Sequence, residues 1–169
     1  HADKGRDVRS FISYLVGCLF GRYSLDQEGL VYAGGDFDVS KYTSYYVDKD
    51  NIIPITTIHG LSDDLASQVM NLVKGIYGDK TYYENLEFIA EGIGKRSDET
   101  AADTIRRYLE NDFHKDHCRI YQKRPIYWML SSGKKNGFKA LFYLHRYDKN
   151  LLANVVSKYY YPHQQRLNQ

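Results

Sequence analysis

The sequence predicts a helix-rich α+β domain with a C-terminal β-hairpin packed on helices. Several segments place apolar residues at helical spacing, which predicts amphipathic or buried helices. Two aromatic-rich runs of strand length lie close together near the C-terminus, with a short polar connection between them. The chain has 169 residues, of which 43% are hydrophobic and 26% charged. These values are typical of one soluble globular domain.

Residues 1–9 are polar, and we expect a disordered leader or a cloning remnant there, followed by a single domain over residues 10–169. The apolar run Phe11–Phe20 is shorter than the roughly 18 residues of a membrane span. It also lacks the flank and cleavage site of a signal peptide. Cys18 and Cys118 have no paired spacing, so neither a disulfide framework nor a cysteine zinc site is indicated. We therefore expect a cytoplasmic protein with no membrane partner.

The first predicted helix follows Ser10 and is apolar almost all round, so it must be buried. Gly17 and Gly21 weaken it, which indicates close approach of a neighbouring element. The range 24–50 reads as a long irregular connection with a short strand at Leu30–Tyr32. An extended run begins at Ile52, and Pro54 within it predicts an edge strand or no strand.

Helical signals dominate the following part of the chain. Capping residues, apolar periodicity and terminal glycines predict four helices. They run from Ser62 to about Lys74, from about Tyr82 to Ala90, from Ser97 or Asp98 through Phe113, and from Asp148 through Tyr159.

The hairpin is predicted between the last two helices. Its strands are Ile126–Leu130 and Phe138–Leu144, joined by the lysine- and glycine-containing connection Ser132–Gly137. Successive residues of a strand point to opposite faces, so only one of Tyr127 and Trp128 can face the core. We expect Trp128 to be the buried ring.

The net charge of +2 conceals an uneven distribution. Residues 1–103 contain 10 Lys and Arg against 17 Asp and Glu, whereas residues 104–169 contain 13 against 4. Such asymmetry indicates either an anionic partner for the basic half or packing of one half against the other. The basic excess coincides with aromatic residues, a combination that suits nucleic acid.

A nucleic-acid duplex is the partner that this basic and aromatic stretch predicts. Tyr127 and Tyr143 are the candidates for stacking on bases. The candidates for phosphate contacts are Arg119, Lys123, Arg124, Lys134, Lys135, Lys139 and Arg146. An alternative for His145 and Arg146 is that they close the hairpin by cross-strand contacts.

Other chemistry is weakly supported. The segment YAGGDFD from Tyr32 reads as an acidic glycine turn, because no helix pattern follows it and the dinucleotide spacing is absent. His114 and His117 could share a helix face as metal ligands, but no second ligand cluster is evident. No nucleophile motif is present. We predict no catalytic, metal or cofactor site in this chain.

Four blocks carry a family resemblance. They are VGCLFGRYSLDQEGLVYAGG from Val16, DKDNIIPI from Asp48, YGDKTYYENLEFIAEGIG from Tyr77, and KDHCRIYQKRPIYWMLSSGKKNGFKALFYLHRY from Lys115. In this order they resemble the C-terminal part of the PglX family, the adenine-specific DNA methyltransferases of BREX phage-defence systems. The resemblance implies a parent enzyme that transfers a methyl group from S-adenosylmethionine to adenine N6. Its Asn-Pro-Pro-Tyr/Phe tetrapeptide and cofactor glycine loop are absent here, since all three prolines stand alone.

Two functional hypotheses follow from this resemblance. The chain is a non-catalytic, DNA-engaging or specificity-supporting region of such a methyltransferase, inactive alone and without its own cofactor. The alternative is a protein-interaction module. In that case the acidic ranges 36–50 and 98–103 dock the methyltransferase core or another BREX subunit, or a phage DNA-mimic inhibitor meets the basic face.

Overall fold

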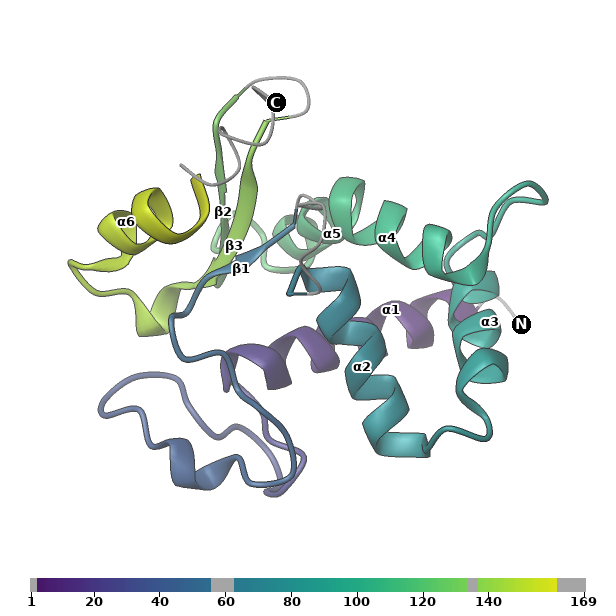
Figure 1. The fold of residues 1–169 in the computed structure, drawn as a ribbon, viewed down its shortest axis with the longest axis horizontal. Helices are drawn as coiled ribbons and strands as arrows, with labels where there is room; N and C mark the ends of the chain where they lie inside the picture. The colour runs from purple at the N-terminus through teal and green to yellow at the C-terminus, as the bar shows by residue number, and fades with distance from the viewer. Residues whose placement is uncertain (1–2, 56–62, 134–136, 161–169) are drawn as a thin grey trace.

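The computed structural model describes residues 3–55, 63–133 and 137–160. Within these ranges, helices and a small antiparallel sheet form an α+β fold, which confirms the predicted class (Figure 1). The helices are α1 Asp3–Phe20, α2 Leu65–Tyr77, α3 Tyr82–Gly92, α4 Ala101–Asn111, α5 Phe113–Ile120 and α6 Leu151–Asn154. The strands are β1 Ile53–Pro54, β2 Tyr127–Ser131 and β3 Lys139–Tyr143. Short 3-10 turns occupy Val39–Lys41 and Leu144–Arg146, and a π-helical turn, Val155–Tyr160, follows α6.

Helix α1 begins earlier than predicted. Residues 3–9, expected to be a disordered leader, form its first two turns. Val8 is only 4% exposed and continues the buried stripe of Ile12 and Leu15 toward the N-terminus. A Cβ on Gly92 would lie 2.6 Å from the Val8 side chain, so the glycine at the end of α3 admits this contact. The polar residues of the segment face outward, which is why its composition resembled a leader.

The close approach predicted for the two glycines of the first helix is confirmed. A Cβ on Gly17 would meet the Tyr23 ring at 2.6 Å, and one on Gly21 would meet the Phe37 ring at 2.7 Å. Gly21 also has a φ of 87°, the left-handed conformation that commonly ends a helix at glycine.

The helices between β1 and the hairpin differ from the prediction at their ends. Ser62, the predicted cap of α2, lies outside the described residues, and Asp64 occupies the N-cap position there. The predicted helix from Ser97 or Asp98 through Phe113 is two helices, because the chain bends at Asp112. The first of them, α4, is capped by Thr100. No helix in the described parts of the chain is long and apolar enough to cross a membrane.

The sheet has the order β1-β3-β2, with both pairs antiparallel. The predicted hairpin is confirmed, with Tyr127 opposite Tyr143 and Ser131 opposite Lys139. Strand β1 lies at an edge, as its proline predicted. The short strand predicted at Leu30–Tyr32 is absent; the N–H groups of Val31 and Tyr32 both donate to the carbonyl of Arg22 and form no ladder with another strand.

The sheet lies between α6 and the other helices (Figure 1), and an apolar core lies on each side of it. Tyr127 and Tyr143 face the larger core with α1 and α5, whereas Phe142 faces the smaller core with α6. The expectation that Trp128 is buried is wrong. Its side chain is 46% exposed, and Tyr127 is the buried ring at 2%. Trp128 pairs with Phe142 on the α6 side, where the short helix covers only part of the sheet.

Candidate nucleic-acid interface

Helix α5 places two cationic side chains on the surface. Lys115 and Arg119 are four residues apart, share one helical face and are exposed. Phe113 and His117 face the core, at 3% exposed each. The alternation of basic and buried residues that the sequence showed in this segment is therefore that of an amphipathic helix with a cationic outer face.

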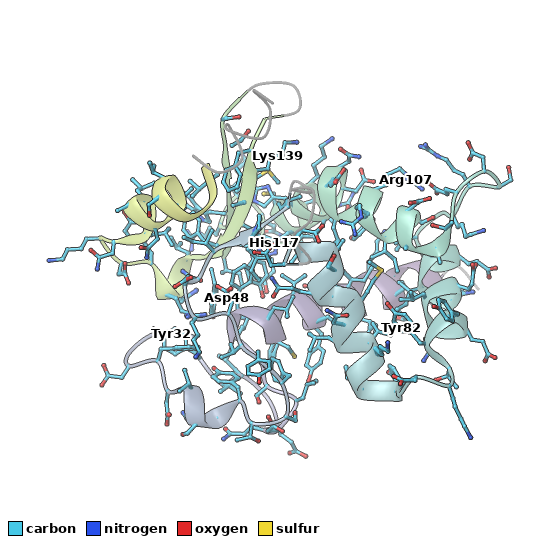
Figure 2. The ribbon with its side chains drawn as sticks, viewed as in Figure 1. Tyr32, Asp48, Tyr82, Arg107, His117 and Lys139 are labelled. Carbon is cyan, nitrogen blue, oxygen red and sulfur yellow. The ribbon has the colours of Figure 1, made fainter. Side chains whose placement is uncertain are left out.

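His117 joins α5 to the start of the hairpin. Its Nε2 accepts hydrogen bonds from the backbone N–H groups of Ile126 at 2.9 Å and Tyr127 at 3.2 Å. Burial, with a smaller contribution from the neighbouring His114, lowers the pKa of His117 to about 4. The ring is thus neutral at pH 7 and can act as this acceptor. Figure 2 shows His117 between the helical part of the molecule and the hairpin that carries Lys139.

The turn between α5 and β2 presents two further cations. Gln122 and Lys123 have φ values of 47° and 72°, a left-handed conformation that costs non-glycine residues about 1–2 kcal/mol each. A hydrogen bond of 2.9 Å from the Arg124 N–H to the Tyr121 carbonyl closes the turn. Lys123 and Arg124 are both exposed. Strained turns of this kind are commonly found at functional sites.

Helix α1 lies opposite α5 and forms the second wall of a basic groove. A groove of about 1010 Å³ runs between α1 and α5 and is lined by basic, aromatic and small polar side chains. Its basic side chains are Arg6, Arg9, Lys115 and Arg119; its aromatic side chains include Tyr14, Tyr23, Tyr108 and Tyr121; Ser10 and Ser13 also line it. The two carboxylates in the lining belong to Asp112 and Asp116.

Asp116 holds the two walls of the groove together. One of its carboxylate oxygens lies 3.6 Å from Arg9 Nε and accepts a 2.8 Å hydrogen bond from the Tyr108 hydroxyl. The other oxygen lies 2.8 Å from Arg119 Nη2. The Asp116 side chain is 19% exposed, whereas that of Arg119 is 75% exposed. The carboxylate thus orients two guanidinium groups and leaves the groove with a net positive charge.

Six of the seven predicted phosphate contacts divide into three groups. Arg119, Lys123 and Arg124 lie on the surface of α5 and the following turn. Lys139 is half-buried at the start of β3. Lys134 and Lys135, at the predicted hairpin tip, lie outside the described residues.

Arg146 is a structural residue in this fold, not the exposed phosphate ligand that we predicted. Its Nη1 donates to the carbonyls of Phe20 at 3.0 Å and Asp48 at 2.7 Å, and its Nη2 to that of Lys49 at 3.2 Å. The guanidinium carbon also lies 3.7 Å from the centroid of the Phe37 ring. A cation at the C-terminal end of α1 satisfies its free carbonyl and interacts favourably with the helix dipole.

The stacking role predicted for Tyr127 and Tyr143 does not fit the structure, because both rings are buried. Tyr143 is fully buried, and its hydroxyl donates to the Tyr32 carbonyl at 2.6 Å and accepts from Arg22 Nη1 at 3.2 Å. The Tyr127 ring packs against Phe20 with centroids 5.7 Å apart. An exposed aromatic ring beside the basic turn is that of Trp128, whose Nε1 donates to the Pro125 carbonyl at 2.9 Å.

Sequence reasoning missed the contribution of α1. Arg6 and Arg9 fall in the segment predicted to be a leader, and that prediction does not place them beside α5. The signal that could have found them is Val8, which continues the apolar spacing of Ile12 and Leu15 one turn earlier.

Other candidate chemistry is not assembled here. His114 Nε2 lies 3.0 Å from the Tyr127 carbonyl and His117 binds backbone N–H groups, so both histidines contact the hairpin. No group of three or more residues that could hold a metal ion occurs among the described residues. The glycines at Gly34 and Gly35 are followed by the 3-10 turn Val39–Lys41, without the α-helix that a dinucleotide loop requires.

Two curated proteins match this chain over nearly its whole length. The adenine-specific methyltransferase PglX of Lacticaseibacillus casei (strain Zhang) is 47% identical over 167 residues, which cover 97% of this chain. The adenine-specific methyltransferase BrxX of Escherichia coli O9:H4 (strain HS) is 43% identical over 167 residues, which cover 92% of it. The chain spans only 14% of the length of each relative. No family model matches the chain.

Proposed function

We propose that this chain, which is homologous to a segment of the adenine-specific methyltransferases PglX and BrxX, is a non-catalytic region of such an enzyme that contacts double-stranded DNA. The observation that carries the proposal is the cationic surface formed by α1, α5 and the turn before β2. Its six cations are Arg6, Arg9, Lys115, Arg119, Lys123 and Arg124.

The contact that this surface favours is with the phosphate backbone. Arginine and lysine side chains on an exposed groove neutralise phosphates and release counterions, which supplies affinity without regard to sequence. Trp128, beside the turn, is the candidate for an additional contact with sugar or base. Tyr127 and Tyr143 instead support the hairpin from within.

Methyl transfer would be performed by the remainder of the enzyme. S-adenosylmethionine supplies the methyl group in the reaction that the resemblance implies, and the resemblance also implies a glycine-rich loop that binds this cofactor. The described residues contain no such loop, and the sequence contains no Asn-Pro-Pro-Tyr/Phe tetrapeptide. We therefore propose that this region positions DNA and is inactive alone, in a cytoplasmic enzyme.

The test is fluorescence anisotropy of the chain with a labelled duplex of about 25 base pairs, titrated across salt. The variant replaces Arg119, Lys123 and Arg124 by Gln, and a matched control replaces the exposed Lys49, Lys74 and Lys80 by Gln. Both variants lose three positive charges, so the change in net charge is the same in the two proteins. We expect the first to lower the slope of log affinity against log salt by about 0.9 for each contact removed.

Equal slopes for the two variants would contradict the proposed surface. Absence of binding by the wild-type chain at low salt would favour the interaction module instead. The acidic ranges give that alternative little direct support, because several of their carboxylates are bonded within the chain. Asp38 accepts from Ser40, Glu99 pairs with Arg107 and Asp103 caps α4.

A further inference from the structure

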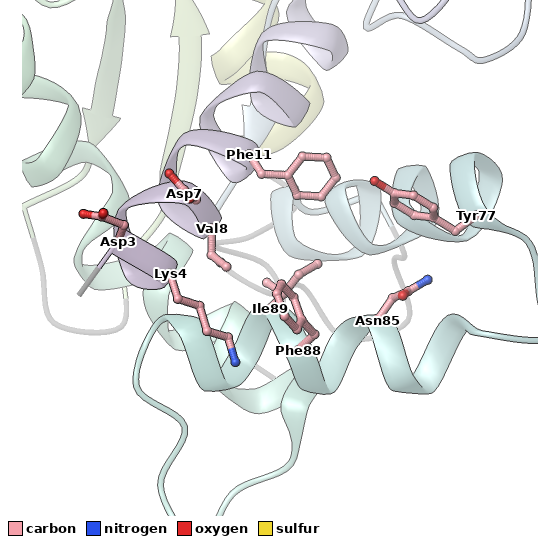
Figure 3. A pocket seen from close by; sticks show the side chains of 9 residues that line it. All are labelled: Asp3, Lys4, Asp7, Val8, Phe11, Tyr77, Asn85, Phe88 and Ile89. Carbon is pink, nitrogen blue, oxygen red and sulfur yellow. The ribbon is translucent and has the colours of Figure 1, made fainter. Parts of the chain in front are cut away.

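A second groove lies on the other side of α1. It has a volume of about 850 Å³ and runs between α1, the end of α2 and α3 (Figure 3). Val8, Phe11 and Ile89 form its apolar floor, and Tyr77 and Phe88 stand at its edges. Figure 3 shows Lys4 and Val8 of α1 pointing toward Phe88 and Ile89 of α3, whereas the carboxylates of Asp3 and Asp7 point away from α3.

The aromatic rings of this groove are unusually exposed for apolar side chains. Tyr77 is 54% exposed and Phe88 is 56% exposed. The Nζ of Lys4 lies 4.4 Å from the centroid of the Phe88 ring, and the Tyr77 ring lies 6.3 Å from that of Phe11. Exposed apolar surface of this kind, with a polar rim, is typical of an interaction site.

The rim of the groove is acidic. Asp3 and Asp7 line it from α1, and both are exposed. On α3, Glu84 and Glu91 lie four residues before and three residues after Phe88, so they share its helical face. Lys4, which also lines the groove, lies 3.9 Å from Glu91, and Arg6 lies 3.4 Å from Asp3. Four carboxylates against these two cations leave the rim with a net negative charge, which Asp7 and Glu84 carry.

We propose that this groove docks a basic amphipathic helix from the remainder of the methyltransferase polypeptide. The proposal rests on the function proposed above. An apolar floor between acidic walls complements a helix with apolar residues at positions i, i+4 and i+7 and with lysine or arginine beside them. The same acidic rim repels DNA, so the two grooves on either side of α1 would serve different partners.

The lengths of the relatives support an intramolecular occupant. This segment accounts for 14% of their length, so most of the polypeptide of those enzymes lies outside it. Surfaces between domains of one chain combine apolar and polar residues, as this groove does. Helix α1 would then connect the DNA-contacting surface to the rest of the enzyme.

Thiol labelling tests the proposal without DNA. Phe88→Cys is compared in the 169-residue chain and in the full-length methyltransferase polypeptide, with Cys118→Ser in both and Cys18 left in place because it is buried. Tyr83→Cys, on the same helix, 78% exposed and outside the groove lining, is the control. We expect the full-length protein to slow labelling at position 88 by tenfold or more and to leave position 83 unchanged. Equal rates at position 88 in the two proteins would overturn the proposal.

A charge reversal tests the chemistry of the occupant. In the full-length protein with Phe88→Cys, the double variant Glu84→Lys and Glu91→Lys should restore fast labelling, because it repels a basic helix. The control Glu28→Lys and Asp36→Lys changes the charge equally at exposed positions outside the groove. Continued protection in the first variant would exclude a basic occupant. Neither result depends on DNA affinity, so this proposal can fail while the DNA-contacting role stands.

Discussion

The side-chain amide of Asn51 forms hydrogen bonds with both backbone polar groups of Tyr143, 92 residues later in the sequence. Asn51 Nδ2 donates to the Tyr143 carbonyl at 2.9 Å, and the Tyr143 N–H donates to Asn51 Oδ1 at 3.0 Å. Ile53 is the partner of Leu141 in the sheet, so Asn51, two residues earlier, lies opposite Tyr143, where the next hydrogen-bonded pair of the ladder would be. With a φ of 58°, the Asn51 backbone leaves the extended conformation of a strand. Its side-chain amide takes the place of the backbone N–H and carbonyl that would otherwise pair with Tyr143.

Replacing Asn51 by Ala should lower the free energy of unfolding by about 2–4 kcal/mol. The change leaves a buried N–H and a buried carbonyl without partners, at roughly 1–3 kcal/mol for each. Alanine also tolerates a positive φ less well than asparagine. Urea unfolding followed by circular dichroism measures the effect. The exposed Asn111 at the end of α4 is a suitable control for Asn→Ala, with an expected change of less than about 0.5 kcal/mol. Equal effects at the two positions would contradict the ladder role.

Neighbouring aromatic residues of β2 should respond very differently to substitution. Tyr127→Ala should cost about 3–5 kcal/mol, as removal of large buried rings does, because Tyr127 is 2% exposed. Trp128→Ala should cost less than half as much, because its ring is 46% exposed and packs on the smaller core. Chemical denaturation of both variants decides between this arrangement and the reverse one that the sequence favoured.

The contrast between these two rings shows where sequence reasoning reached its limit. Strand composition and the glycine-containing connection were sufficient to predict the hairpin, because they are local signals. Which face of the hairpin is more deeply buried depends on the sizes of the two cores. Those sizes depend on how α1, more than 100 residues earlier in the sequence, and α6, which follows the hairpin, pack on its two faces.

The same limit applies to the candidate site. Arg119, Lys123 and Arg124 could be predicted to be exposed from their spacing on and after a helix. The role of Arg146 could not, since the carbonyl that it binds belongs to Phe20, 126 residues earlier. Basic composition alone does not separate a cation that binds a helix end from one that faces solvent.

His117 should make the protein less stable in acid. Its folded pKa of about 4 lies below the unfolded value of 6.5, because burial disfavours the imidazolium form. Its contribution to stability is therefore present above pH 6.5 and is lost as the pH falls toward 4. About 3 kcal/mol should be lost between pH 7 and pH 4. His117→Gln keeps an acceptor but does not titrate, so the wild type should lose this much relative to the variant. If the difference in free energy of unfolding between the wild type and His117→Gln did not change with pH, His117 would not have the lowered pKa inferred here.

Asp48 should have the opposite effect over a similar range. Burial raises its pKa from 3.8 to about 6, against the opposing influence of the Ile52 N–H and Arg146, while Asp50 raises it further. The folded state thus favours protonated Asp48, and this stabilisation is present below pH 3.8 and lost as the pH rises through 6. Asp48→Asn should therefore gain about 2 kcal/mol on the wild type between pH 4 and pH 7. Chemical denaturation of both proteins at several pH values measures this gain. A difference in free energy of unfolding that stayed constant from pH 4 to pH 7 would contradict the raised pKa of Asp48.

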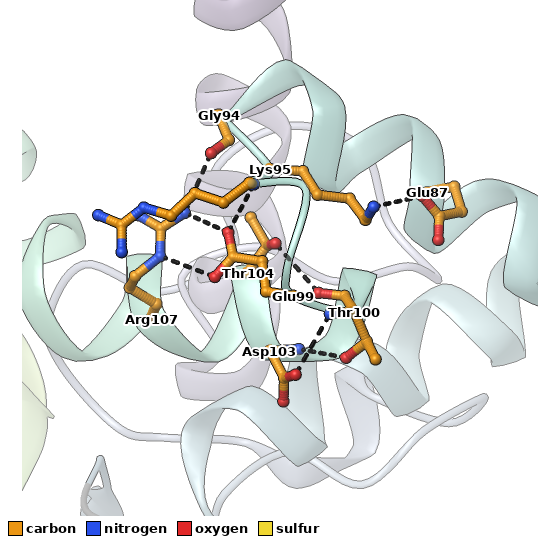
Figure 4. A network of polar contacts seen from close by, with 9 residues as sticks. Glu87, Gly94, Lys95, Glu99, Thr100, Asp103, Thr104 and Arg107 are labelled. Atoms are coloured by element: carbon orange, nitrogen blue, oxygen red, sulfur yellow. Dashed lines mark hydrogen bonds and ion pairs between the residues drawn. The ribbon is translucent and has the colours of Figure 1, made fainter.

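The start of α4 offers a test of local structure (Figure 4). The Thr100 hydroxyl accepts from the Asp103 N–H at 3.1 Å, and the Asp103 carboxylate accepts from the Thr100 N–H at 3.2 Å, which forms a capping box. Arg107 and Glu99 join the preceding loop to the same helix, with Nη2 and Oε1 2.6 Å apart. This second contact should hold the loop in place when the cap is changed.

Thr100→Ala should lower the free energy of unfolding by about 1 kcal/mol, the usual effect of removing an N-cap side chain. Thr100→Ser keeps the hydroxyl and should be close to the wild type. Urea unfolding of the two variants separates loss of the cap from loss of the threonine methyl group. If the serine variant were as unstable as the alanine variant, packing of that methyl group would be the cause. The capping box would then contribute little to the position of α4. It would equally contribute little to the position of Tyr108, the α4 residue whose hydroxyl binds Asp116 in the basic groove.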